Sequence, residues 1–172
     1  NQTILEPEQV YFFENKNGNQ FYEKASGSIY VKVPLLPFEA FASYAETLEV
    51  GKPIKDLEIE EFAVDQYGKG NYMAFKVRGD SMNGGSIEDT PDGAKVLARE
   101  LGRQHWKDGF NDTEYGWIIL CKENIFHKDI VAYDAETGDI TLHSRNKSPE
   151  YSDFTINLND CYQIFKVIKR TF

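Results

Sequence analysis

The chain has 172 residues, a formal net charge of −9 and a hydrophobic content of 41%. A chain of this length buries about 70% of its unfolded surface when it folds, so a globular domain needs no disulfide framework. The acidic charge disfavours a nucleic-acid-binding protein. No apolar run approaches the roughly 20 residues that span a bilayer, and the first residues lack the pattern of a signal peptide. We therefore expect a cytoplasmic protein without membrane contact.

The first third of the chain contains few strong structural signals. Residues 1–30 are polar and include an Asn/Gly cluster, which indicates an N-terminal arm or linker. Residues 28–36 alternate between apolar and polar and then meet Pro34 and Pro37, which predicts a short strand that stops. Residues 38–48 are rich in alanine and fit either a brief helix or an extended segment.

The strand signal strengthens from Tyr72 onward. Short apolar runs alternate with Gly, Asn and Asp turns, which is typical of a mostly β domain. Residues 93–102 fit a helix or a strand equally well. The strand-like segments are 71–79, 115–122, 124–134, 140–146 and 161–172.

The two cysteines, Cys121 and Cys161, form no Cys-x-x-Cys motif and are too few for a disulfide framework. Cys121 ends an apolar run and is expected to be a small buried hydrophobic residue. This pattern indicates a reducing compartment, with a single disulfide as the alternative. The three histidines, at positions 105, 127 and 143, lack the spacing of metal ligands, so we expect neither a metal nor a cofactor.

Ser81 lies in the stretch "FKVRGDSMNGG", where a strand runs into a turn flanked by glycines. Glycine permits unusual backbone angles, so the turn can expose the hydroxyl and nearby amides, which could bind an oxyanion. The same stretch contains the adhesion tetrapeptide Arg-Gly-Asp-Ser, but that function requires export. A serine nucleophile needs a base, and no Gly-x-Ser-x-Gly elbow is present.

Lys128 is a candidate for that base. In "IFHKDIV" the strand period puts Phe126, Lys128 and Ile130 on one face. If that face is covered, burial lowers the pKa of the amine and leaves it neutral. The alternative is a lysine that extends from a sheet edge into water, and the spacing alone leaves both open.

Together, "FKVRGDSM" (75–82), "IEDTPDGAKVLAR" (87–99) and "IFHKDI" (125–130) resemble the LexA/UmuD-type self-cleaving serine peptidases, which include the peptidase domains of phage-type repressors. The family pattern is a strand, Gly-Asp-Ser-Met, an Asp-Gly loop, a strand, and a lysine inside a later hydrophobic strand. The likeness extends from Tyr30 to Phe172. It implies a strongly bent, LexA/signal-peptidase-like β-sheet domain, here with an N-terminal arm.

The resemblance also implies roles for individual residues. Ser81 matches the nucleophile and Lys128 the general base of a Ser-Lys dyad. The turn around Ser81, formed by Gly79, Asp80 and Met82, matches the oxyanion region. In this family the substrate is an upstream segment of the same chain, cut at a bond between small residues.

The matching bond here is Ala42-Ser43. The expected organisation is an arm or linker (1–30), a cleavage-site segment (31–50) and a peptidase and dimerisation domain (51–172). A helix-turn-helix DNA-binding domain would precede this chain. Two features depart from the family: Ser43 stands where glycine is usual, and the loop after Met82 is longer and lacks a proline.

The resemblance therefore predicts the self-cleaving domain of a LexA-like or phage-repressor-like transcriptional regulator. We expect a homodimer, DNA contact only through the upstream domain, and a RecA filament as the trigger of an SOS-type response. The alternative is a dimerisation or signal-binding module that has lost cleavage, which the serine at position 43 favours.

Overall fold

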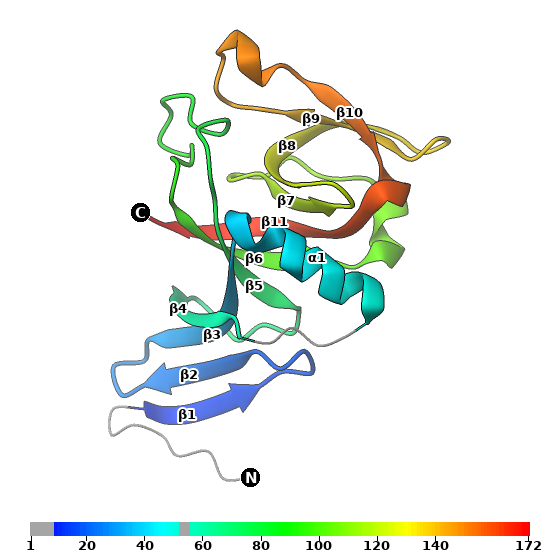
Figure 1. Ribbon diagram of the computed structural model, residues 1–172. Helices are drawn as coiled ribbons and strands as arrows, with labels where there is room; N and C mark the ends of the chain where they lie inside the picture. The colour runs from blue at the N-terminus through cyan, green and yellow to red at the C-terminus, as the bar shows by residue number, and fades with distance from the viewer. Residues whose placement is uncertain (1–8, 52–55) are drawn as a thin grey trace.

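The computed structural model describes residues 9–51 and 56–172 (Figure 1). Within them the fold is mostly β, with one open mixed sheet in the order β1-β2-β3-β5-β6-β11-β7-β8-β9-β10 and β4 paired to β3. The strands are β1 (Gln9–Glu14), β2 (Gln20–Lys24), β3 (Ile29–Pro37), β4 (Glu58–Val64), β5 (Tyr72–Lys76), β6 (Lys95–Leu101), β7 (Trp117–Cys121), β8 (Ile125–Asp134), β9 (Asp139–His143), β10 (Phe154–Asn157) and β11 (Cys161–Thr171).

Strand β3 lies at a branch point of the sheet. Its first half pairs with β2 and its second half with β5, while β4 pairs along its other edge. The β3–β5 pair is parallel and the other recorded pairs are antiparallel. The described segment before helix α1 is therefore built into the sheet.

The period-two pattern of the central strands divides their side chains between separate hydrophobic clusters. On β5, Met73 and Phe75 belong to one cluster, whereas Ala74 packs into another with Phe21 and Leu97. The strand predicted within residues 71–79 is thus confirmed as Tyr72–Lys76, with apolar side chains on both of its faces. Residues 93–102, which fitted either element, form strand β6 because both faces at this place are buried.

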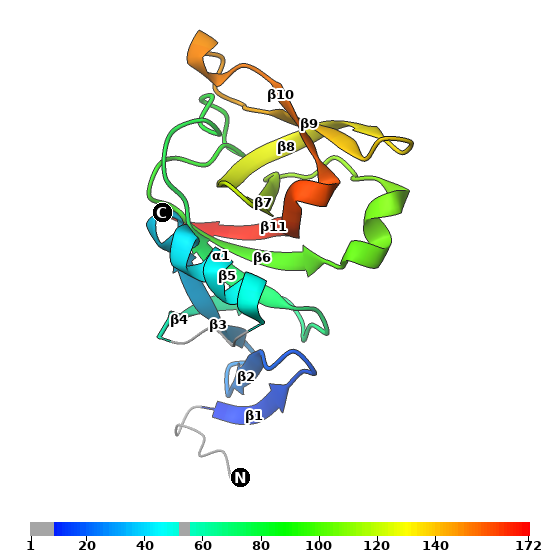
Figure 2. The ribbon, with the colours of Figure 1, turned by 45° about the vertical axis from the view of Figure 1, so that its right-hand side comes forward.

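Helix α1 (Phe41–Val50) follows a short 3₁₀ turn and crosses the sheet in front of β5 and β6 (Figures 1 and 2). Phe41, Tyr44 and Ala45 form its buried stripe. The spacing of these residues at i, i+3 and i+4 is that of an amphipathic helix, and Gly51 ends it in the left-handed conformation (φ 67°). Residues 38–48 therefore adopt the helical alternative.

Residues 9–30 differ from the predicted arm or linker. They form the β1–β2 hairpin and the start of β3, and Phe21 is fully buried. The Asn/Gly cluster is the hairpin turn, in which Asn15 donates to the carbonyls of Gly68 and Gly70. These side-chain bonds tie the hairpin to a distant loop, which composition alone does not reveal. Residues 1–8 of the predicted arm lie outside the described residues.

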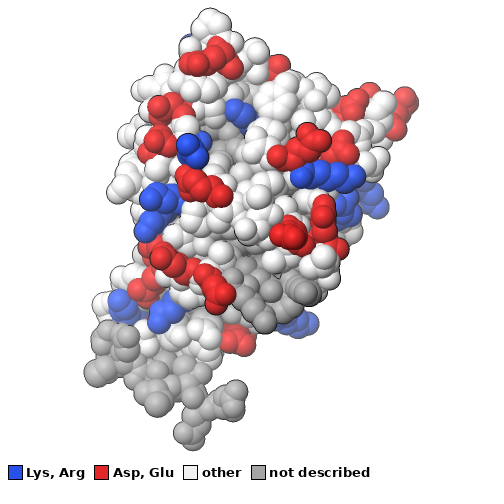
Figure 3. Space-filling view, in the orientation of Figure 1, with Lys and Arg blue, Asp and Glu red and all other residues white. Residues whose placement is uncertain are grey.

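Acidic and basic side chains are interspersed over the face shown in Figure 3, with acidic groups more widely spread. This distribution accords with the net charge of −9. In the described part of the chain, no helix is long and apolar enough to cross a bilayer.

The packing predicts which aromatic residues stabilise the fold. Phe165 on β11 is fully buried and meets Phe75 edge-on, with ring centroids 5.1 Å apart. Phe165→Ala should lower the free energy of unfolding by about 3–5 kcal/mol, measured by denaturant titration. Phe172→Ala removes the same group where it is 80% exposed and should cost less than about 0.5 kcal/mol. Similar losses in both variants would contradict this packing.

Candidate active site

Ser81 lies in a tight turn that follows strand β5. Gly79 has φ 92°, a backbone angle that favours glycine, and its amide donates to Asp92 at 2.7 Å. The amide of Asn83 donates to the Asp80 carbonyl and closes the turn. The amides of Ser81 and Met82 donate no hydrogen bond to any described residue. The turn thus leaves two donors beside the Ser81 hydroxyl.

Lys128 lies inside strand β8, opposite Trp117 of β7. The side chain is on a covered face, one of the two alternatives that the spacing left open, and the residue is only 8% exposed. Desolvation lowers the pKa of the amine below its ordinary value. Its Nζ donates to Oγ of Ser144, 2.7 Å away, and Ser144 is itself buried. The lysine is therefore desolvated and held in one direction, rather than extending into water from a sheet edge.

A three-residue segment after β9, Ser144-Arg145-Asn146, binds both candidate residues. Ser144 accepts the hydrogen bond from Lys128. Asn146 donates its backbone amide to the Ser81 carbonyl at 2.9 Å and its side-chain amide to the Asp80 carbonyl at 3.0 Å. In the described residues, no hydrogen bond joins Ser81 Oγ to Lys128 Nζ. The two residues are thus tied to one short segment but not hydrogen-bonded to each other through their side chains.

Arg145 links this segment to the surrounding loops. Its guanidinium makes two bonds of 2.9 Å to the Asp129 carboxylate, and it lies 3.6 Å from Asp89. It also donates to the carbonyls of Glu88 and Glu114. The hydrogen bond with Asp129 raises the pKa of Arg145 further, so the group is a permanent cation. Planar, multidentate contacts of this kind are specific to arginine.

The loop after Met82, which departs from the family pattern, is held by buried polar contacts. Asp89 is buried and accepts bonds from the amides of Gly84 and Ser86. A Cβ on Gly84 would lie 2.2 Å from the Arg145 carbonyl, so only glycine allows this approach. The extra length of the loop therefore forms an ordered cover next to Arg145.

His127, which neighbours Lys128 on the opposite face, is also buried. Its Nε2 lies 2.7 Å from the Tyr115 carbonyl. Desolvation lowers the pKa of His127 to about 4, so the ring is neutral at neutral pH. Met82 is buried too, with its methyl group against Gly116. Both residues hold the strand and turn in place rather than facing a substrate.

The predicted cleavage site is in another element. Ala42 and Ser43 lie in the first turn of α1, where both are exposed. The N-cap residue of the helix, Ala40, provides no side-chain hydrogen bond to the first turn. In an α-helix the carbonyl of residue i accepts a hydrogen bond from the amide of residue i+4, so a nucleophile can reach the Ala42 carbonyl only after the first turn unwinds.

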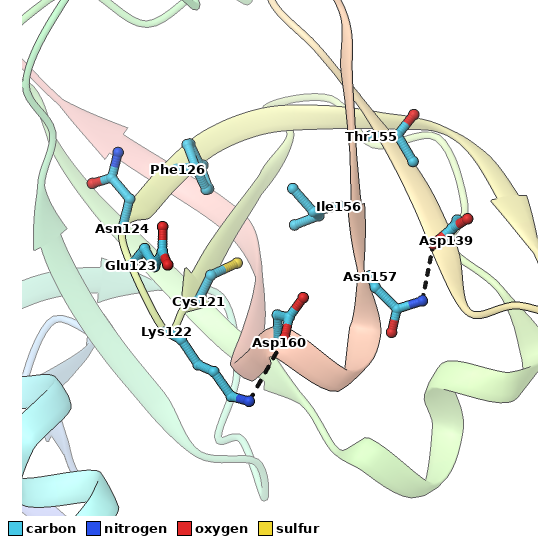
Figure 4. Close-up of a pocket in the computed structure, with 10 residues that line it drawn as sticks. All are labelled: Cys121, Lys122, Glu123, Asn124, Phe126, Asp139, Thr155, Ile156, Asn157 and Asp160. Carbon is cyan, nitrogen blue, oxygen red and sulfur yellow. Dashed lines mark hydrogen bonds and ion pairs between the residues drawn. The ribbon is translucent and has the colours of Figure 1, made fainter.

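A cavity of about 530 Å³ lies elsewhere, between the β7–β8 turn and strands β9 and β10 (Figure 4). Neither Ser81 nor Lys128 lines it. Its ten lining residues are Cys121, Lys122, Glu123, Asn124, Phe126, Asp139, Thr155, Ile156, Asn157 and Asp160. Across the residues the structure describes, no group of three or more His, Cys, Asp or Glu side chains could hold a metal ion.

Comparison with known proteins leaves the family of this chain open. No protein-family model and no curated protein matches it.

Sequence reasoning singled out Ser81 and Lys128 but missed the segment that holds them. Residues 144–146 were predicted as part of the strand-like segment 140–146, whereas β9 ends at His143 and they follow it as three polar residues. Their importance depends on contacts 16 to 66 positions away along the chain. The one available signal was an arginine between two hydrogen-bonding side chains, directly after a buried strand.

Arg145 offers a test of this arrangement. Arg145→Lys keeps the charge but loses the paired contact with Asp129, and should lower the free energy of unfolding by about 2 kcal/mol. Hydrogen exchange should also quicken in residues 83–90. Lys122→Ala breaks an ion pair whose side chains are more than half exposed and should cost less than about 0.5 kcal/mol. Unchanged exchange in Arg145→Lys would contradict the linking role.

His127 predicts a specific loss of stability in acid. Its pKa is about 4 in the fold and 6.5 when exposed, so between these values the unfolded chain binds more protons and stability falls as pH falls. Full protonation corresponds to about 3 kcal/mol. His127→Gln, which keeps a donor for the Tyr115 carbonyl, should flatten this part of the profile. Denaturant titrations from about pH 7 to about pH 4 would measure it, and parallel profiles would refute it.

Proposed function

We propose that this chain is the self-cleaving Ser-Lys peptidase and dimerisation domain of a LexA-like or phage-repressor-like transcriptional regulator. The observation that carries the proposal is the buried amine of Lys128, desolvated on a covered strand and tied to the segment that also binds the Ser81 turn. A lysine with no acidic partner among the described residues is costly to bury unless it is neutral. A neutral amine is the form that can accept a proton from serine.

The chemistry follows from these groups. Lys128 takes the proton of Ser81 Oγ, which attacks the carbonyl carbon of Ala42. The free amides of Ser81 and Met82 are suited to stabilise the oxyanion. The Lys128 ammonium then returns its proton to the nitrogen of Ser43 as the bond breaks, leaving an acyl group on Ser81. Water, activated by the same amine, releases it.

The proposal requires movement of both the general base and the segment that contains the bond to be cut. Lys128 Nζ must turn from Ser144 toward Ser81, and the first turn of α1 must unwind to present the Ala42-Ser43 bond. A trigger such as a RecA filament would act by favouring that conformation, since a ligand shifts an equilibrium by its difference in affinity for the two states. Cleavage would cut the covalent link to an upstream DNA-binding domain.

The homodimer, the cytoplasmic location and the strongly bent LexA-like form of the sheet belong to the same proposal. They rest on the resemblance of residues 75–82, 87–99 and 125–130 to the family.

A second function, a dimerisation or signal-binding module that no longer cleaves, is favoured by two observations. The Lys128 amine is bonded to Ser144 rather than to Ser81. The Ala42-Ser43 bond is helical, and Ser43 replaces the usual glycine. Both would also be expected of a peptidase at rest, so only an activity measurement separates the two functions.

Self-cleavage should increase with pH, because the lowered pKa of Lys128 leaves a growing neutral fraction as pH rises. The purified chain is incubated from about pH 7 to about pH 10 and analysed on denaturing gels and by mass spectrometry. We expect one cut, between Ala42 and Ser43. Ser81→Ala and Lys128→Ala should abolish it, and an intact wild type across this range would favour the non-cleaving module.

A matched pair at position 43 tests whether helix unwinding limits the rate. Glycine in a helix is about 1 kcal/mol less favourable than alanine, which corresponds to about fivefold in rate. Ser43→Gly should therefore cut at least about fivefold faster than Ser43→Ala. Equal rates would show that α1 does not control access to the bond.

A further inference from the structure

Cys121 on β7 and Cys161 on β11 are direct partners in the antiparallel ladder. Both are free thiols, and their Sγ atoms lie 3.4 Å apart. Opposite residues of such a pair have Cβ atoms about 4.5–5.5 Å apart, and a disulfide needs about 3.5–4.5 Å. The two side chains already point at each other, so a small approach of the strands would let a bond form.

The backbone of β11 next to Cys161 is irregular, which allows the two strands to move closer at this point. The register between β11 and β7 shifts immediately after Cys161, between Cys161 and Gln163. A bulge interrupts the regular ladder and lets the strand bend locally. Cys121 is also the last residue of β7. The thiols thus lie where β7 ends and β11 begins, outside the regular part of the ladder.

Only one of the two thiols lies at the cavity described above. Cys121 lines the cavity of about 530 Å³. Figure 4 shows its sulfur pointing toward the space between Phe126, Ile156 and Asp160. Cys161 does not line the cavity and is 2% exposed. Both thiols are buried, Cys121 at 6% exposed, and a reagent that enters the cavity meets Cys121 before Cys161, whose sulfur lies 3.4 Å from it.

The cavity carries an excess of negative charge. Its charged lining residues are Lys122, Glu123, Asp139 and Asp160, one cation and three anions, which gives a formal charge of −2. Lys122 lies 3.6 Å from Asp160, so its charge is already paired. Such a wall attracts cations and repels anions.

We propose that Cys121 and Cys161 form a reversible oxidation site that takes low-molecular-weight disulfides through this cavity, cationic ones in preference to anionic ones. The Cys121 thiolate attacks one sulfur of the disulfide and releases the other half as a thiol. The Cys161 thiolate then attacks the Cys121 sulfur and releases the second half. Two protein thiols are oxidised, one small disulfide is reduced to two thiols, and the protons pass to the leaving sulfurs.

The hydrogen bond with Cys161 and burial both raise the pKa of the Cys121 thiol. Because the thiolate is the reactive form, the exchange should be slow at neutral pH and faster at higher pH.

The test compares cystamine, a dication, with oxidised glutathione, an anion, at equal concentration on the reduced full chain. Remaining thiols are trapped with N-ethylmaleimide in denaturant, and intact mass and linked peptides are recorded. We expect a mass about 2 Da below the reduced chain and a peptide joining Cys121 to Cys161. Cystamine should react at least about tenfold faster at low salt, and the ratio should shrink in about 1 M salt.

Three variants serve as controls. Cys161→Ala should stop at a stable mixed disulfide on Cys121, whereas Cys121→Ala should react at least about tenfold more slowly, because Cys161 does not line the cavity. Glu123→Gln, which removes one wall charge, should reduce the preference for cystamine.

Two results would overturn the proposal: separate adducts on the two cysteines without a linked peptide, or equal rates with the two reagents. The linked peptide is measured on the wild type, so the test does not depend on whether a variant folds. It is also independent of peptidase activity, since neither Ser81 nor Lys128 takes part.

Discussion

The paired contact between Arg145 and Asp129 is the constraint on which the candidate site depends. Asp129 follows Lys128 on strand β8, and Arg145 follows Ser144 on the chain that leaves β9. The ion pair therefore sets how far Ser144 lies from the lysine. The same guanidinium reaches Asp89 and the carbonyls of the long loop. One side chain thus fixes three segments that are distant in sequence, and the position of the Ser81 turn follows from them.

Burial acts in the same sense on both faces of β8. On one face, desolvation favours a neutral amine at Lys128, and on the other it favours a neutral ring at His127. The permanent cation in this region, Arg145, is instead matched by the carboxylate of Asp129. The charged Arg145 is thus paired with a carboxylate, whereas burial favours the neutral forms of Lys128 and His127. Low-dielectric surroundings disfavour a charge that has no partner. Two groups with lowered pKa values thus lie beside a paired, charged support.

Much of the sheet could be predicted from local pattern, because the short apolar runs at 71–79 and 124–134 are separated by Gly, Asn and Asp turns. The strand near residue 97 remained ambiguous, since burial on both faces removes the alternation that marks a strand. The hairpin of residues 9–24 was missed because Asn15 and Asn19 bond to residues 68–72, a contact with no local signal. For the site, the sequence pointed to Ser81 and Lys128, whereas Ser144-Arg145-Asn146 required the fold.

The branch point at β3 has a consequence for any cut in the following helix. Strand β3 is hydrogen-bonded to β4 on one edge and to β2 and β5 on the other, and Val31, Val33 and Leu36 are buried. A chain severed at Ala42-Ser43 would keep this strand in the middle of its sheet. The two pieces would remain one folded body, as in a nicked protein reconstituted from complementary fragments. Release of anything attached upstream would then be governed by how fast β3 leaves the sheet, not by how fast the bond is broken.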